Sequence, residues 1–101
     1  MLISGMAIQG FANPRVEEFF VTGRVAKRVG WAGVASIARR KLDMLHYAQQ
    51  LADLRSPPGN RLEALVGDLA GVHSIRINDK WRVVFRWGDL GPAEVDIVDD
   101  H

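Results

Sequence analysis

The stretch HSIRINDKWRVVFRW, residues 73–87, decides the fold class of this chain. Apolar and polar residues alternate through its first half, and they alternate again from Trp81 to Trp87, after the polar pair Asn78-Asp79. Alternation with a period of two is typical of a strand that buries one face, and a short polar pair between two such runs is typical of a hairpin turn. The sequence therefore predicts an antiparallel β-hairpin.

Two helices are predicted before this hairpin. Asn13-Pro14 supplies an N-cap followed by proline at the first helical position, and Gly23 ends the short helix that follows. Apolar residues at a spacing of three and four predict a longer helix over 33–54. The prolines and the glycine of residues 56–60 terminate this helical half of the chain.

Short extended segments complete the predicted sheet. The apolar residues 6–12 predict a first strand, residues 61–65 form a short run, and residues 66–71 form a loop bounded by glycines. Val95 and Ile97 alternate with acidic residues in a last strand. We expect an α+β fold in which two N-terminal helices pack on a curved, mainly antiparallel sheet of four to five strands.

Composition excludes several classes of function. The chain has 101 residues, a formal charge of +1 and no cysteine, which excludes disulfides, thiolate nucleophiles and iron–sulfur sites. His46, His73 and His101 lack the spacing of metal ligands, and no glycine-rich phosphate loop is present, so we expect no metal and no cofactor. No run approaches the ~18 apolar residues of a membrane span, so we expect a cytoplasmic protein without a membrane partner.

The length predicts a single domain over residues 1–101. We interpret residues 1–5 as an N-terminal extension, with either Met1 or Met6 as the start. Charge is distributed unevenly, because residues 15–61 carry nine basic and four acidic groups (9 − 4 = +5). The remainder carries four basic and eight acidic groups (4 − 8 = −4). The basic half is either a solvated helix face or an electrostatic footprint for nucleic acid.

Three arginines of the hairpin are candidates for a binding surface. The alternation puts Arg76, Arg82 and Arg86 on the strand face opposite the apolar residues. A guanidinium group matches phosphate oxygens in a bidentate manner, so these residues suit a phosphate-binding surface. The alternative is a clamp for acidic residues of the neighbouring strand, such as Glu94 and Asp96.

Residues 57–87 resemble a known family. The run PPGNRLEAL at 57–65, the Gly67-Asp68 turn, HSIRINDKWR at 73–82 and FRW at 85–87 are similar to segments of HigB-type host-inhibition toxins. These toxins, also called plasmid maintenance killer proteins, belong to the RelE/ParE superfamily of toxin–antitoxin modules. The similarity extends from residue 6 to the C-terminus.

The resemblance implies a RelE-like fold and a toxin that cuts mRNA on the translating ribosome without a metal ion. It also implies a HigA-like helix-turn-helix antitoxin, through which alone the toxin would contact operator DNA. The reaction implied is attack of a ribose 2′-hydroxyl on the adjacent phosphate, which needs a base, an acid and positive charge near the phosphoryl oxygens.

Four residues match the family's catalytic positions. Arg82 corresponds to the phosphate-stabilising residue, His101 to a C-terminal histidine used in acid–base chemistry, and Asp99 to an aspartate near it. Strand parity puts Asp99 and His101 on one side. Glu63 stands where some members have a histidine base.

The resemblance also implies an RNA-binding set: Arg61, Arg76, Lys80, Arg86 and Asp100. The chain departs from the family at three of the positions compared. Asp100 replaces a tyrosine that could stack on a base, and Val66 and Leu69 replace basic residues beside the Gly67-Asp68 turn. These departures keep three alternatives open: a degenerate toxin that binds its antitoxin without cleaving RNA, a ParE-like gyrase inhibitor, and an unrelated binding module.

Overall fold

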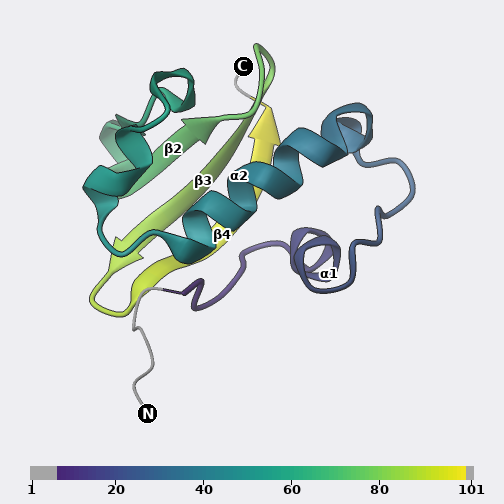
Figure 1. The fold of residues 1–101 in the computed structure, drawn as a ribbon, viewed down its shortest axis with the longest axis horizontal. Coiled ribbons are helices and arrows are strands. Elements are labelled where there is room, and N and C mark those ends of the chain that lie inside the picture. Colours follow the sequence, from purple (N-terminus) through teal and green to yellow (C-terminus); the bar gives the residue numbers. More distant parts are fainter. Residues whose placement is uncertain (1–6, 100–101) are drawn as a thin grey trace.

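The computed structural model describes residues 7–99 and contains two α-helices and one antiparallel sheet (Figure 1). Neighbouring strands of the sheet follow one another in sequence, in the order β1-β2-β3-β4. The elements are α1 (Pro14–Thr22), α2 (Ala35–Tyr47), β1 (Glu63–Ala64), β2 (Val72–Arg76), β3 (Trp81–Gly88) and β4 (Gly91–Asp99). Short 3-10 turns lie at Gly30–Val34, Leu51–Arg55, Pro58–Asn60 and Gly67–Leu69. The predicted α+β class, with helices before a meander of strands, is confirmed.

The first helix has the predicted limits. The Asn13 side chain accepts a hydrogen bond from the Arg15 backbone N–H at 2.9 Å, and Pro14 is the first helical residue. Gly23 has φ of 80° and donates its N–H to the Phe19 carbonyl at 2.8 Å. This left-handed conformation favours glycine, which explains why the helix ends there.

The second helix is shorter than predicted. It begins at Ala35 and ends at Tyr47, because Ala48 is extended, and a separate 3-10 turn follows where helix was expected up to residue 54. Gln50 and Asp53 cap that turn reciprocally. The backbone N–H groups of Gln49 and Gln50 donate to the Asp53 carboxylate at 2.9 and 3.2 Å, and these hydrogen bonds lower the pKa of Asp53.

The strand predicted over residues 6–12 is wrong as a strand. Its described part, residues 7–12, runs beside β4 in the parallel direction with a single bridge between Phe11 and Val95. Three backbone hydrogen bonds hold it there, among them Gln9 N–H to the Pro92 carbonyl at 2.8 Å. The named strands of the sheet in the described part of the chain therefore number four, and residues 1–6 lie outside that part.

The hairpin follows the predicted alternation. Ile75 faces Val83 across β2 and β3, and Arg76 faces Arg82, so each pair lies on one face of the sheet. The register between β3 and β4 shifts between Val84 and Arg86, where Glu94 adopts φ of 52°. Such a bulge bends the strand while the residues on either side stay paired.

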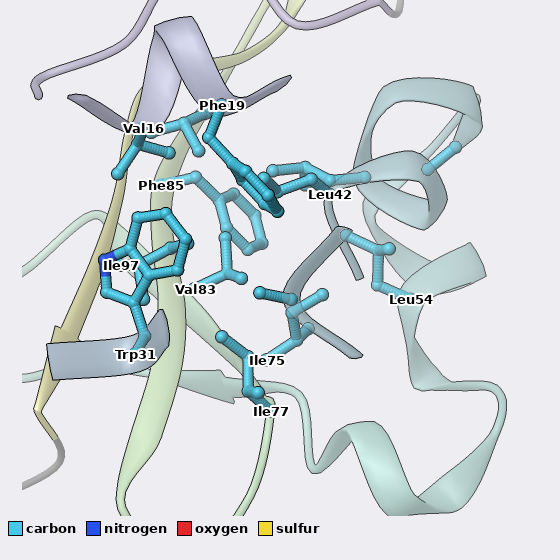
Figure 2. Close-up of a cluster of buried hydrophobic side chains, with 14 residues drawn as sticks. Val16, Phe19, Trp31, Leu42, Leu54, Ile75, Ile77, Val83, Phe85 and Ile97 are labelled. Atoms are coloured by element: carbon cyan, nitrogen blue, oxygen red, sulfur yellow. The ribbon is translucent and has the colours of Figure 1, made fainter. Parts of the chain in front are cut away.

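The core lies between the helices and one face of the sheet (Figure 2). Phe85 and Val83 of β3 meet Leu42 of α2 and Phe19 of α1 there, and all four are buried. Trp31 packs against Phe19 with the ring centroids 4.8 Å apart. Among the described residues, no helix is long and apolar enough to cross a membrane.

Candidate functional site

The sheet face opposite the core carries the three arginines of the hairpin. Arg76 lies opposite Arg82 on the neighbouring strand, and Val98 of β4 lies opposite Arg82 on its other side. Arg86 follows at the same parity along β3. The predicted placement of Arg76, Arg82 and Arg86 on one face is therefore confirmed by the register.

A pocket of about 360 Å³ opens on this face. Its floor comes from β2, β3 and β4, and one wall comes from the segment after β1, which contributes Leu65 and Leu69. The lining residues are Leu65, Leu69, Val72, Ser74, Arg82, Val84, Val98 and Asp99. The walls are mainly apolar, and the polar groups come from Ser74, Arg82 and Asp99. Apolar walls of this kind suit a planar ring such as a nucleobase. A phosphate group would instead bind to the guanidinium of Arg82.

Arg82 is buried although it lines the pocket, with a relative exposure of 6%. Its Nε donates to Ser74 Oγ at 2.8 Å, and its Nη2 donates to the Arg61 carbonyl at 2.7 Å. These contacts hold the guanidinium plane in one orientation. A charge held in this way inside a partly desolvated site interacts strongly with a developing negative charge.

Glu63 lies beside Arg82. It stands on β1 directly opposite Ser74, and its Oε1 is 3.6 Å from Arg82 Nη2. Its side chain is exposed, in contrast to the buried guanidinium. The structure therefore brings the predicted carboxylate base close to the predicted phosphate-stabilising residue, which lines the pocket.

Asp99 reaches the same pocket from the end of β4. It lies opposite Trp81 in the register, so it has the parity of the core face, whereas Arg82 has the parity of the open face. Its Oδ2 is 3.9 Å from Lys80 Nζ. Asp100 and His101, which were predicted to act beside it, lie outside the described residues.

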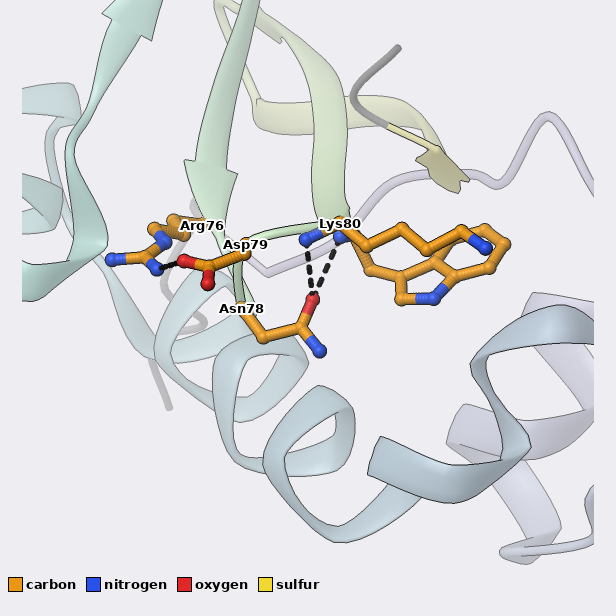
Figure 3. Close-up of polar contacts among 5 residues, drawn as sticks. Arg76, Asn78, Asp79 and Lys80 are labelled. Carbon is orange, nitrogen blue, oxygen red and sulfur yellow. Dashed lines mark hydrogen bonds and ion pairs between the residues drawn. The ribbon is translucent and has the colours of Figure 1, made fainter.

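The cations predicted to bind RNA are largely engaged within the protein. Arg76 pairs with Asp79 at the hairpin turn, where Asn78 Oδ1 also accepts the backbone N–H groups of Lys80 and Trp81 (Figure 3). The Lys80 ammonium lies over the Trp81 ring, 5.6 Å from its centroid. These contacts order the turn, and the Asp79 carboxylate offsets the charge of Arg76.

The arginine clamp is confirmed in one of its two expected contacts. Arg86 Nε is 3.4 Å from Glu94 Oε1, and Nη1 donates to the Ala70 carbonyl at 3.2 Å. Asp96 instead accepts a hydrogen bond from Asn13 Nδ2 at 3.1 Å. Arg61 is exposed, and its side chain forms no ion pair within residues 7–99.

Three buried polar residues were missed in the sequence analysis, and of these Ser74 contacts Arg82 directly. Ser74 orients Arg82, and alternation alone indicated only that its side chain is on the open face. Asn60 and Lys41 are buried and hydrogen-bonded to each other at 2.6 Å. Asn60 belongs to the motif at 57–65, which could have indicated it, whereas Lys41 sits in an ordinary helical pattern. Within residues 7–99, no group of three or more His, Asp or Glu side chains could hold a metal ion.

Comparisons with known proteins show the family of this chain. The family model described as "RelE-like toxin of type II toxin-antitoxin system HigB" matches residues 9–101. Toxin HigB-1 of Vibrio cholerae is 38% identical over 96 residues, which cover 95% of this chain and 98% of that protein. An uncharacterized protein of Haemophilus influenzae is 39% identical over 77 residues, which cover 76% of this chain and 75% of that protein. The solved YoeB/ParE toxin from Agrobacterium tumefaciens is 19% identical, with a TM-score of 0.49 and coverage of 92% of this chain and 93% of that one. On the family match and the identity across nearly the whole chain, the protein belongs to the HigB family of RelE-like toxins from type II toxin–antitoxin systems.

Proposed function

We propose that this toxin is a metal-independent endoribonuclease that cuts mRNA on the translating ribosome in the cytoplasm. Its partner in this proposal is a HigA-like helix-turn-helix antitoxin, which neutralises it and alone contacts operator DNA. The observation that supports the proposal best is the anchored guanidinium of Arg82. It is 6% exposed and held by two hydrogen bonds, yet it lines a pocket on the open face of the sheet.

The burial of Arg82 supports a role in catalysis over a role in stability. Removing an ion from water costs several kcal/mol, so a buried charge is weak evidence for stabilisation. The same burial strengthens its interaction with charge that develops in a transition state, because no reorganisation is needed when the reaction occurs. Arg82 therefore suits the phosphoryl oxygens, whose negative charge grows during cleavage.

In the proposed reaction, the ribose 2′-hydroxyl attacks the adjacent phosphorus and its proton passes to the Glu63 carboxylate. The bond to the 5′-oxygen breaks, and His101 donates a proton to that oxygen, with Asp99 orienting the imidazole. The products are a 2′,3′-cyclic phosphate and a free 5′-hydroxyl. Glu63 is suitable as the base because its exposed oxygen lies 3.6 Å from Arg82 Nη2, beside the proposed phosphate position.

A second candidate is a degenerate toxin that binds its antitoxin without cleaving RNA. The exposed apolar side chains of Val66 and Leu69 favour it, because they stand where the family's pattern has cations. Leu69 also lines the pocket, so the lost charge would lie close to the proposed RNA path.

Mapping of transcript ends after a short induction separates these functions. We expect new 5′ ends within translated codons for the parent toxin, and none for Arg82→Lys, which keeps the charge but loses the two-donor fork. The matched control is a reporter transcript whose start codon is removed, which should stay intact. Antitoxin binding without any new ends would establish the degenerate toxin. Equal cleavage of untranslated RNA would indicate a free nuclease, and growth arrest with gyrase inhibition but intact transcripts would indicate the ParE-like function.

A further inference from the structure

A lysine is buried on α2, outside the candidate site. Lys41 of α2 is 7% exposed, and its Nζ donates to Asn60 Oδ1 at 2.6 Å. Burial lowers the pKa of Lys41, and the nearby guanidinium groups of Arg40 and Arg76 lower it further. Within residues 7–99, the hydrogen bond of this ammonium is to a neutral amide. An apolar side chain would fill the same place without the desolvation cost, so the buried charge calls for a reason other than packing.

Asn60 is hydrogen-bonded to the loop before β1. Its side chain is fully buried, and its Nδ2 donates to the Leu54 carbonyl at 3.1 Å and to the Ser56 carbonyl at 3.4 Å. Its backbone N–H also donates to the Pro57 carbonyl at 2.9 Å. With Lys41 on Oδ1 and two carbonyls on Nδ2, this amide joins α2 to both ends of the turn and prevents the turn from shifting.

The next residue, Arg61, contacts Arg82 through its backbone carbonyl. Arg61 has φ of 46° and ψ of 57°, a left-handed backbone conformation that residues other than glycine rarely adopt. Such a conformation persists only where the surroundings impose it. Here its carbonyl oxygen accepts the hydrogen bond from Arg82 Nη2 at 2.7 Å. That carbonyl therefore belongs to the residue directly after the fixed Asn60, and it is one of the acceptors that hold the guanidinium.

We propose that Lys41 is a positioning residue, which holds Arg82 in its productive orientation through Asn60 and the Arg61 carbonyl. This inference rests on the proposed function, because it assigns a purpose to the orientation of Arg82 in phosphate cleavage. Lys41 does not touch RNA in this scheme. Its ammonium acts through the amide, the strained backbone of Arg61 and the guanidinium, in that order.

The direct test observes the Arg82 guanidinium itself. In ¹⁵N-labelled toxin, the Arg82 Nη2–H signals are assigned by their loss in Arg82→Lys, and their hydrogen-exchange rate is measured in the parent and in Lys41→Met. We expect this exchange to be about tenfold faster or more in Lys41→Met, because Nη2 loses its acceptor when the Arg61 carbonyl shifts. Leu45→Val is the matched control, since it shortens a buried side chain one turn further along α2 and leaves the Lys41–Asn60 contact in place.

A kinetic measurement on programmed ribosomes adds the functional readout. We expect the single-turnover cleavage rate of Lys41→Met to fall by up to about 10²-fold, the effect of misplacing a reacting group by about 1 Å. The ribosome concentration at half saturation should not change, because Lys41 faces the protein interior. In an Arg82→Lys background, Lys41→Met should cause no further loss. If Lys41→Met does not fold, Lys41→Gln, whose shorter amide cannot reach Asn60, serves the same purpose.

The outcomes separate the two proposals. Faster Arg82 exchange in the Lys41 variant but not in Leu45→Val supports the positioning role, whether or not the parent cleaves RNA. Parent toxin that leaves programmed mRNA intact contradicts the proposed function alone, and the exchange rates still decide the role of Lys41. The positioning role of Lys41 would be overturned by an unchanged Arg82 exchange rate in Lys41→Met. It would also be overturned if cleavage fell equally in Lys41→Met and Leu45→Val at a matched loss of thermal stability.

Discussion

Replacing Arg82 by alanine is expected to reduce thermal stability as well as activity. The substitution removes a side chain that is 6% exposed and donates to Ser74 Oγ at 2.8 Å and to the Arg61 carbonyl at 2.7 Å. Each buried acceptor that loses its donor costs about 1–3 kcal/mol. We take the lower end for each, about 2 kcal/mol in total, because the pocket of about 360 Å³ adjoins Ser74 and Arg61 is exposed, so water can replace the lost donor. For a domain of this size, that loss lowers Tm by about 8–16 °C.

The catalytic loss is expected to be larger than the stability loss. Removing one preorganised donor to a developing oxyanion reduces the rate by about 10²–10³. Cleavage is therefore measured at a temperature well below the Tm of the variant, so that the folded fraction stays close to one. Under that condition, any fall in the single-turnover rate reports the lost transition-state interaction and not partial unfolding.

The assay compares parent, Arg82→Ala and Ser74→Ala by thermal unfolding and by single-turnover cleavage on programmed ribosomes. Ser74→Ala removes the acceptor of Arg82 Nε but keeps the guanidinium and its bond to Arg61, so its stability loss should be about 1 kcal/mol and its rate loss should be smaller than that of Arg82→Ala. An Arg82→Ala protein with the Tm of the parent would refute the anchoring described here. An Arg82→Ala protein that cleaves as fast as the parent would refute the assignment of Arg82 to the phosphate.

Three further predictions concern the surroundings of the site. Val66→Lys adds a cation at a position whose side chain is 84% exposed. It should lower the apparent KM for programmed ribosomes and steepen the dependence of log affinity on log salt concentration by about 0.7 per phosphate contact. An unchanged slope would place this side chain away from RNA. Removing His101 should reduce cleavage by about 10²–10⁴ with little change in Tm, and equal single-turnover rates would leave it without a role in proton transfer. Gly30→Ala would put its Cβ 2.6 Å from the Trp81 ring and should cost about 1–3 kcal/mol in chemical denaturation, whereas Gly33→Ala, with nothing within 4 Å, is the control that should not share this cost.

The local elements of this protein could be predicted from sequence because their causes lie within a few residues. The cap at Asn13, the proline after it and the glycine at position 23 define α1 through interactions of the helix ends alone. The alternation over 73–87 predicts the hairpin for the same reason, since strand parity is a property of the backbone. Parity also suffices to put three arginines on one face, whereas only the resemblance to HigB-type toxins links Arg82 to the motif at 57–65.

The limits of some elements, by contrast, depend on contacts that no local pattern contains. Apolar spacing continues through Leu51 and Leu54, yet α2 ends at Tyr47, and a separate turn packs Leu54 into the core, where its carbonyl accepts a hydrogen bond from the buried Asn60. Residues 7–12 have the composition of a strand, but they pair with β4 through a single bridge, between Phe11 and Val95. In both places, tertiary packing selects among conformations that the local sequence permits equally.

What the tertiary structure alone decides is the environment of each charged residue. Sequence places Arg82 on the open face, but only the approach of Ser74 and the Arg61 carbonyl makes it buried and anchored. Sequence likewise places Lys41 on a helix, but only the fold places its ammonium against Asn60, a residue 19 positions away. The physical reason is that burial and hydrogen bonding are properties of pairs of distant segments, whereas capping and strand parity are properties of one. The sequence by itself therefore determined on which face of the sheet Arg82 lies, and the packing around Arg82 determined the chemistry available to it.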